Sequence, residues 1–164
     1  MRALLVVLLL SGCYHVRLNE KTVKEDVSEF KPEQKEELKK VIIALSAEAR
    51  LKAQRKADSD DAAAIAEGRK LISAAETMTC IECHKFAGEG KTKGPDLTGY
   101  GSTEWMTAMI SNPAHKRFYG DKNDRMPAFA LHPNDPTLNR ISPQELAVLV
   151  SWLRGEWYEP APHK

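Results

Sequence analysis

The sequence has few cysteines, almost no net charge and no long apolar segment, and each absence excludes a class of protein. The 24 Lys and Arg residues are balanced by 23 Asp and Glu residues, so a net charge of +1 leaves no overall field to attract a nucleic acid. The apolar run at residues 3–10 is far shorter than the roughly 20 residues of a membrane-spanning helix. Three cysteines occur and none follows Cys83, so a zinc site with a second cysteine pair is excluded.

The chain has enough material for one folded domain with additional segments at its ends. A hydrophobic content of 42% in 164 residues supports one core of ordinary size. Charged residues are concentrated in the first third of the chain. We therefore divide the chain into a leader (1–12), a charged and partly helical spacer (13–60), a main domain (61–158) and a tail (159–164).

The first residues have the layout of an export signal. Arg2 precedes the apolar run, and Ser11 and Gly12 supply small residues before Cys13. Residues 10–13 resemble the lipobox of bacterial lipoproteins, which implies that Cys13 becomes the first mature residue and carries acyl chains. Several such chains hold a protein stably on a membrane. We expect an exported protein on the periplasmic side, anchored through lipidated Cys13; an ordinary leader that contains a cysteine is the alternative.

The spacer contains one helical pattern. A helix over residues 33–56 is predicted because apolar residues recur on one face. These residues are Leu38, Val41, Ile42, Leu45 and Ala49. The narrow apolar face fits a spacer that lifts the domain above the membrane, and it equally fits a helix that packs on the domain or on a partner. The pattern does not decide between these interpretations.

Residues 80–84 read Cys-Ile-Glu-Cys-His, the C-x-x-C-H pattern for covalent haem attachment. Two thiols at this spacing add to the two vinyl groups of haem, and the adjacent His84 then binds the iron. A thioredoxin-like redox pair would need a βαβ pattern that does not precede it, and a disulfide between Cys80 and Cys83 would be strained. A zinc site is not favoured, because no further cysteine follows Cys83 to supply a second pair of ligands. The motif therefore predicts one covalently bound haem c with its iron.

Residues 62–158 resemble a class I cytochrome c. The features that carry the resemblance occur in the family's order: a helix over residues 62–79 with Gly68, the C-x-x-C-H motif, Gly-Pro-Asp-Leu-Thr-Gly at 94–99, Met126-Pro127, and a closing helix with Trp152. The resemblance implies an all-α fold of three to four helices around one covalently bound haem, preceded by the helical spacer.

The resemblance also implies roles for individual residues. Met126 would be the sixth ligand of the iron, and the Pro95 carbonyl would orient His84, as second-shell hydrogen bonds commonly do. Tyr100 and Trp105 resemble the aromatic residues that line the haem and reach its propionates. For both aromatic residues, plain core packing is an equal alternative.

Other side chains could replace Met126 as the sixth ligand. Met126 is favoured because it lies in a loop and the following proline holds its backbone extended. Met78 lies on the attachment side of the haem, and Met106 and Met109 sit in a helix-like run where packing is the usual role. The histidine substitutes are His115 and His132, each of which is otherwise a surface residue.

A closing helix is predicted from its capping signals. Ser142 is the N-cap, Pro143 the first helical residue, Glu145 completes a capping box and Gly155 ends the helix. Its apolar stripe is expected to cross the 62–79 helix, where Gly68 lets the backbones approach. The two facing stripes are Leu146, Leu149, Val150, Leu153 and Trp157, and Ile65, Gly68, Ile72 and Ala75. The preceding segment 112–125 has mixed charges, Lys116, Arg117, Lys122 and Arg125 against Asp121 and Asp124, and is predicted to be a solvated loop. The alternative is that its cations serve a haem propionate or a partner.

These features predict an electron carrier and not an enzyme. With two protein ligands the iron has no open position, so one electron passes on the haem without substrate binding. The expected setting is a membrane-associated respiratory or photosynthetic-type chain, with a cytochrome b type complex or a terminal oxidase as redox partner, and no nucleic acid. The alternatives are a haem-based gas sensor or peroxidase-like enzyme with an open sixth position, and a structural lipoprotein without haem.

Overall fold

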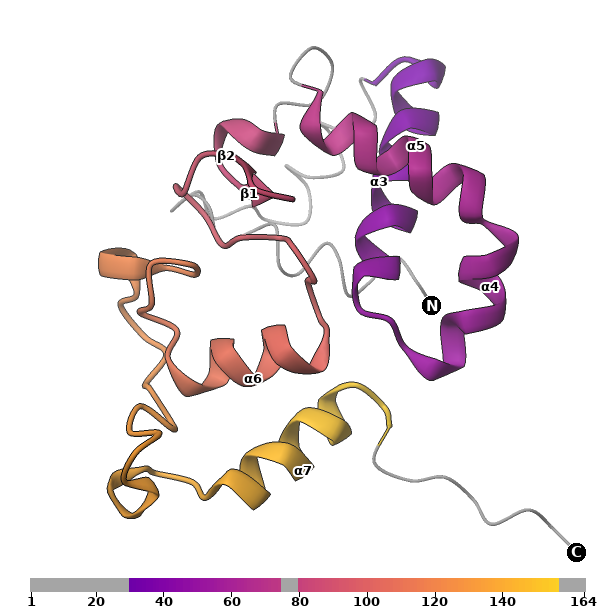
Figure 1. The fold of residues 1–164 in the computed structure, drawn as a ribbon. Coiled ribbons are helices and arrows are strands. Elements are labelled where there is room, and N and C mark those ends of the chain that lie inside the picture. The colour runs from indigo at the N-terminus through magenta and orange to yellow at the C-terminus, as the bar shows by residue number, and fades with distance from the viewer. Residues whose placement is uncertain (1–29, 75–79, 157–164) are drawn as a thin grey trace, which may run out of the picture.

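The computed structural model describes residues 30–74 and 80–156, and its regular structure is mostly helical (Figure 1). The helices are α3 (Pro32–Glu48), α4 (Arg55–Asp60), α5 (Ala62–Ser73), α6 (Thr103–Ser111) and α7 (Pro143–Leu153). Short 3-10 turns lie at Lys52–Gln54, Cys80–Glu82, Gly120–Lys122 and Pro136–Leu138. The described strands β1 (Lys85–Phe86) and β2 (Glu89–Gly90) form one small antiparallel pair. The predicted all-α fold class is confirmed.

Helix α3 is shorter than the helix predicted over residues 33–56. Its start is stabilised by Pro32 in the first turn and by Gln34, whose side-chain oxygen accepts the N-cap backbone N–H at 3.0 Å. Beyond its last turn Arg50 adopts a φ of 53°, in the left-handed region that interrupts a right-handed helix. The predicted end at residue 56 is therefore wrong, and a 3-10 turn and α4 occupy residues 52–60.

Helix α3 packs against α5, and Gly68 permits the contact (Figure 1). A Cβ at Gly68 would lie 2.2 Å from the Lys40 carbonyl oxygen and 2.8 Å from the Ala44 Cβ. The predicted close approach of two helices at Gly68 is present, but the predicted partner, the closing helix, is wrong because both neighbours belong to α3. Of the interpretations left open for the predicted spacer helix, packing on the domain is the one that the structure shows.

The main core draws side chains from α3, α5, β1, α6 and the intervening loops. Val41, Ala44 and Leu45 of α3 are 3%, 0% and 4% exposed, which is the burial of core residues. The other buried members of this cluster are Ile72, Phe86, Leu97, Tyr100, Trp105, Met109 and Phe118. Helix α3 and the residues that follow the haem motif therefore share one core.

Helix α5 matches the first part of the helix predicted over residues 62–79. The inward-facing residues Ile65, Gly68 and Ile72 are buried, as their spacing predicts. Ala75 and the predicted end of the helix lie outside the described residues. The stripe therefore faces inward along the described part of α5, with α3 as its cover.

Helix α7 begins and ends where its sequence signals predict. The Glu145 backbone N–H donates to the Ser142 Oγ at 3.2 Å, and the Ser142 N–H donates to the Glu145 carboxylate at 2.7 Å, which closes the predicted capping box. Pro143 is the first helical residue, and Gly155 beyond the last turn has a φ of 68°. Because these signals act within a few residues, they do not depend on the rest of the fold.

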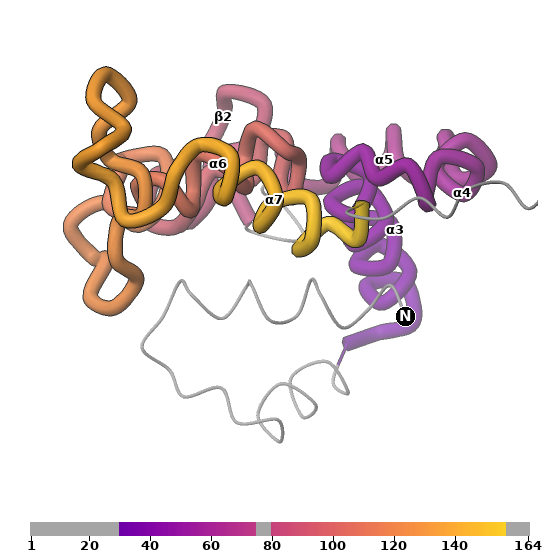
Figure 2. Tube along the Cα trace, turned by 90° about the horizontal axis from the view of Figure 1, so that it is seen from below, coloured from indigo at the N-terminus to yellow at the C-terminus, as the bar shows by residue number. Residues whose placement is uncertain are grey.

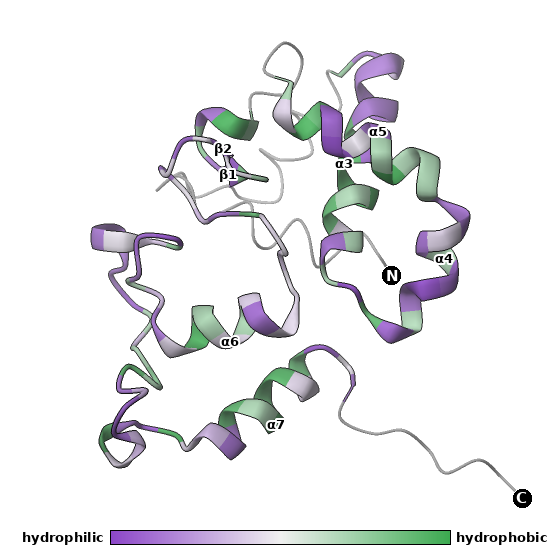
Figure 3. Cartoon of the chain, viewed as in Figure 1, coloured by the Kyte–Doolittle hydropathy of each residue, from purple (hydrophilic) through white to green (hydrophobic). Residues whose placement is uncertain are grey.

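Helix α7 lies beside α6, and only part of its predicted apolar stripe is covered (Figure 1, Figure 2). Leu146 and Val150 are 6% and 1% exposed and belong to a second, smaller cluster with α6. Leu149 and Leu153 are 36% and 44% exposed, and Figure 3 shows the apolar character of this helix. The predicted crossing with α5 is replaced by packing on α6, and Trp157 lies outside the described residues.

The end of α7 is bonded to the segment that follows α3. Arg154, whose side chain is 7% exposed, donates to the Ala49 carbonyl at 3.0 Å and also to the Gly101 carbonyl. Glu156 accepts the Lys52 backbone N–H at 3.0 Å and pairs with Arg154 at 3.1 Å. These contacts join the end of α3, the loop before α6 and the end of α7 at one point.

Candidate functional site

The two cysteines and the histidine of the C-x-x-C-H motif lie in one tight turn. The backbone N–H groups of Cys83 and His84 both donate to the Cys80 carbonyl, at 3.2 and 2.8 Å. Both thiols are half-buried and free of disulfides. Burial, and to a smaller extent the neighbouring Cys83, raises the pKa of the Cys80 thiol above its ordinary value. The turn therefore gathers two free thiols and one imidazole.

His84 is oriented by a backbone carbonyl. The side chain is buried, at 5% exposure, and its Nδ1 lies 2.7 Å from the Pro95 carbonyl oxygen. A carbonyl can only accept, so Nδ1 carries the proton, and in the neutral ring the lone pair lies on Nε2. This is the contact between His84 and Pro95 that the cytochrome resemblance implies.

The Pro95 loop is attached to its surroundings on both sides. The Gly94 N–H donates to the Cys83 carbonyl at 2.8 Å, which closes the loop onto the haem motif. The Gly99 N–H donates to Glu48 of α3, also at 2.8 Å. The carbonyl that faces His84 is therefore presented by backbone that is bonded before and after it.

Tyr100 and Trp105 lie next to this loop. Their buried rings meet edge to face with centroids 4.9 Å apart. The Trp105 indole N–H donates to the Asp96 carbonyl at 2.7 Å. Because this donor is used by the protein backbone, Trp105 matches the core-packing alternative better than the predicted contact with a propionate.

The Tyr100 hydroxyl has a different environment. It is buried and has no hydrogen-bond partner among the described residues. Burial, with a smaller effect of Tyr119, raises the pKa of Tyr100 to about 12. A buried hydroxyl without a partner costs roughly 1–3 kcal/mol. This oxygen is therefore suited to a polar group of a bound molecule.

Met126 belongs to the second cluster, with α6 and α7. It is half-buried, and its backbone carbonyl accepts the Asn123 side-chain amide at 2.8 Å. Met109 is 8% exposed in the main core, and Met106 contacts both clusters, so these two have the packing environments predicted for them. Met78 lies outside the described residues.

The structure brings part of the predicted site together. Cys80, Cys83, His84 and Pro95 form one bonded unit, and Tyr100 and Trp105 adjoin it beside the same loop. The histidines proposed as substitute ligands, His115 and His132, are both exposed. Cys13, the predicted lipidation site, lies outside the described residues.

Arg117 belongs to the charged segment 112–125, for which a solvated loop is the prediction and a cation offered to a propionate or a partner is the alternative. The solvated-loop prediction for residues 112–125 is wrong at this position, because the Arg117 Nη2 donates to the Thr98 carbonyl at 2.8 Å. Its Nε lies 3.5 Å from an Asp96 carboxylate oxygen, an ion-pair contact that is not aligned as a hydrogen bond. The guanidinium stacks 5.7 Å from the centre of the Phe118 ring. Asp96, the acidic residue of the 94–99 motif, is the only feature of the sequence that indicates an ion-pair partner for Arg117.

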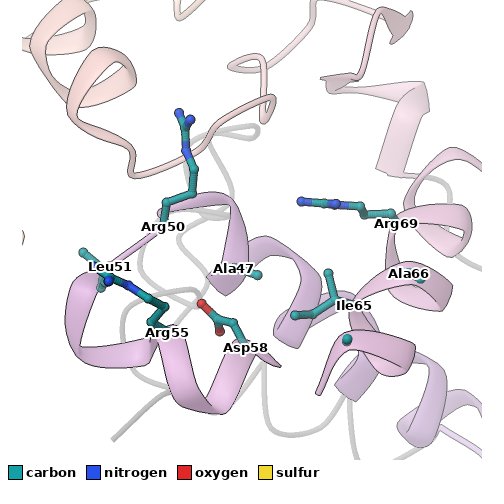
Figure 4. Close-up of a pocket in the computed structure, with 9 residues that line it drawn as sticks. Ala47, Arg50, Leu51, Arg55, Asp58, Ile65, Ala66 and Arg69 are labelled. Atoms are coloured by element: carbon teal, nitrogen blue, oxygen red, sulfur yellow. The ribbon is translucent and has the colours of Figure 1, made fainter. Parts of the chain in front are cut away.

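A cavity of about 450 Å³ lies between α3, α4 and α5 (Figure 4). Aliphatic side chains, three arginines and Asp58 line it. Of the arginines, Arg50 pairs with Glu104 at 3.1 Å and Arg69 pairs with Glu48 at 2.8 Å. None of the lining residues belongs to the predicted cofactor site. The cavity is therefore separate from the bonded unit around His84.

The family model for cytochrome c matches residues 65–157, more than half of the chain. The chain belongs to the cytochrome c family. The match begins within α5 and includes the C-x-x-C-H turn, the Pro95 loop and Met126, whereas α3 precedes it. No curated protein and no solved structure matches the chain significantly.

As a cytochrome c, the protein carries covalently bound haem c with iron and serves haem-based electron transfer. The residues present fit this group: two free thiols at the attachment spacing, an imidazole with its lone pair on Nε2, and the unpartnered Tyr100 hydroxyl. Within residues 30–74 and 80–156, no group of three or more His, Cys, Asp or Glu side chains could hold a metal ion by itself. A protein-only zinc site therefore has no support there.

Proposed function

We propose that this cytochrome c carries one electron on a haem held by Cys80 and Cys83, with His84 and Met126 as axial ligands of the iron. Thioether bonds from the two thiols deliver the adjacent imidazole to the iron. The observation that carries the proposal is the 2.7 Å contact between the His84 Nδ1 and the Pro95 carbonyl, because it leaves Nε2 as the ligating nitrogen.

The proposed ligand pair makes the protein a carrier and not a catalyst. Haem supplies one-electron chemistry, and the chain supplies orientation, burial and axial ligands. A thioether from Met126 would fill the sixth position and favour the reduced iron. Its half-buried place among the apolar side chains of α6 and α7 suits such a ligand, since little water would compete for the iron.

We also propose that the protein works at a membrane surface. Among the described residues no helix is long and apolar enough to cross a membrane. The lipobox-like sequence before Cys13 supports an acyl anchor on the periplasmic side. Redox partners in a respiratory or photosynthetic-type chain, such as a cytochrome b type complex or a terminal oxidase, follow from that setting.

The decisive experiment is the absorption spectrum of the full chain, matured in a bacterial host that exports and attaches haem c. We expect a covalent, low-spin haem with a methionine-to-iron band and no response to carbon monoxide. A high-spin spectrum or carbon monoxide binding would replace the carrier by a gas sensor or peroxidase-like protein. Absence of covalent haem would contradict the proposal altogether.

The same substitution at two methionine positions tests the sixth ligand. Met126→Leu keeps the apolar volume and removes the sulfur, so the methionine band should disappear and carbon monoxide should bind. Met106→Leu is the matched control, because Met106 packs on the same second cluster, and it should leave both properties unchanged. Retention of the band in Met126→Leu would exclude Met126 as the ligand.

The anchor is tested by Cys13→Ala in the full chain. The variant should leave the membrane fraction and keep the haem spectrum of the unchanged protein, because the acyl chains and the haem domain act independently. A variant that remains membrane-bound would contradict lipidation at Cys13.

A further inference from the structure

The peptide unit between Pro95 and Asp96 is hydrogen-bonded at both of its polar atoms. Its carbonyl oxygen lies 2.7 Å from the His84 Nδ1, and its N–H donates to the Arg117 carbonyl at 2.8 Å. A peptide unit is planar, so its two bonding directions are coupled. One amide therefore connects the backbone of Arg117 to the imidazole of His84.

The Arg117 side chain joins the same two segments a second time. Its Nη2 donates to the Thr98 carbonyl at 2.8 Å, and its Nε lies 3.5 Å from the Asp96 carboxylate. The other oxygen of that carboxylate accepts the Thr98 N–H at 2.8 Å, which orients it. The Arg117 and Asp96 side chains are 36% and 18% exposed, so water screens this pair only in part.

We propose that Arg117 is a positioning residue for the axial histidine. It holds the Pro95 carbonyl at hydrogen-bond distance from His84 and thereby sets the orientation and basicity of the imidazole that binds the iron. The inference rests on the proposed function, in which His84 ligates through Nε2. Arg117 itself lies outside the residues that attach or ligate the haem.

The direction of the effect follows from the polarity of the hydrogen-bond chain. An amide whose N–H is already bonded presents a more negative carbonyl oxygen, so bonds in series strengthen one another. A stronger acceptor for the His84 Nδ1–H makes Nε2 a better donor to the iron, which favours the oxidised state. Loosening of the Arg117 contacts should therefore favour the reduced state and raise the reduction potential.

Arg117→Lys is the first test, because lysine keeps the charge but cannot reach Thr98 and Asp96 together. We expect the reduction equilibrium constant to rise about three- to tenfold, or about 28–59 mV at 59 mV per tenfold for one electron. Arg55→Lys is the matched control, because Arg55 is exposed on α4. The reduction potential of this variant should equal that of the unchanged protein.

Asp96→Asn is the second variant, since it weakens the ion pair while one side-chain oxygen still accepts the Thr98 N–H. Asp96→Asn should also raise the reduction potential. The potential of the double variant with Arg117→Lys should rise by less than the sum of the two single shifts, because both substitutions disrupt the same ion pair. If Arg117→Lys fails to fold, Asp96→Asn carries the test through the proton resonance of the His84 Nδ1–H, which should move.

The readouts separate this inference from the function on which it rests. A raised potential with a displaced Nδ1–H resonance, in a protein that keeps covalent low-spin haem, supports the positioning role. Potentials and resonances equal to those of Arg55→Lys, with the haem spectrum intact, would overturn the inference and leave the carrier function in place. A missing low-spin spectrum in the unchanged protein would overturn both.

Discussion

Gly68 of α5 faces the backbone of Lys40 in α3 so closely that a Cβ there would lie 2.2 Å from the Lys40 carbonyl oxygen. The obstructing atom is backbone, so no change of side-chain rotamer can relieve the overlap. The same crossing carries an ion pair between Lys40 and Glu67 at 2.8 Å. The two helices can keep this spacing only with a residue that lacks a side chain.

Gly68→Ala should destabilise the protein by about 1–3 kcal/mol, because the helices must separate to admit the methyl group. The sign makes the test sharp: at an exposed helical site, Gly→Ala stabilises by about 1 kcal/mol through helix propensity. Chemical denaturation followed by circular dichroism measures the change. Lys70→Ala, at an exposed position of the same helix, should stay within about 0.5 kcal/mol of the unchanged protein.

Leu45 tests whether α3 belongs to the core. It is 4% exposed, and Leu45→Ala should cost about 2–5 kcal/mol through lost burial and the cavity left behind. The transition to follow is that of the haem domain, monitored by haem absorbance during thermal unfolding. Leu138→Ala is the control, since Leu138 is 63% exposed. An unchanged haem-domain transition in Leu45→Ala would restore the interpretation of this helix as a separate spacer.

The parts of the fold that the sequence predicts are those decided by local chemistry. The capping box of Ser142 and Glu145 closes within three residues, and the C-x-x-C-H spacing defines its turn by itself. The contact between His84 and Pro95 came from the family resemblance and not from spacing. In each of these cases the partners are close in sequence or belong to one known motif.

The parts that it missed depend on contacts between distant segments. An apolar stripe such as that of α5 shows that a helix is covered but not which helix covers it, so the stripe does not distinguish α3, which packs there, from α7. The charges around Arg117 are mixed, so the sequence does not show which cation of this segment contacts Asp96. Arg50, just beyond the end of α3, has a φ of 53°, and this conformation cannot be predicted from an arginine in the sequence.

Glu156 should make the junction at the end of α7 sensitive to acid. Its bond from the Lys52 N–H, and secondarily its pairing with Arg154, lower the pKa of Glu156 below the ordinary value. A lowered folded pKa stabilises the fold above the unfolded value of about 4.3, and this contribution is lost as the pH falls below it. Glu156→Gln keeps an acceptor oxygen but cannot titrate.

The stability difference between the unchanged protein and Glu156→Gln should therefore be present near neutral pH and shrink in acid. Melting temperatures of both proteins, measured between about pH 3 and 7, give this difference directly. A difference that stays constant across that range would show that the Glu156 charge adds nothing to the junction.

Tyr100 should act in the opposite pH range. Burial raises its pKa to about 12, so the neutral hydroxyl is favoured in the folded state. That contribution is complete below the unfolded value of about 10 and is lost as the pH rises toward the folded value. Tyr100→Phe lacks the titration and removes a buried hydroxyl that has no partner in the described part of the chain.

The unchanged protein should thus lose stability faster than Tyr100→Phe between about pH 10 and 12, as measured by denaturation at each pH. A haem propionate that accepts from Tyr100 would raise this pKa further and extend the loss to still higher pH, whereas parallel curves for the two proteins would show that the hydroxyl is solvated.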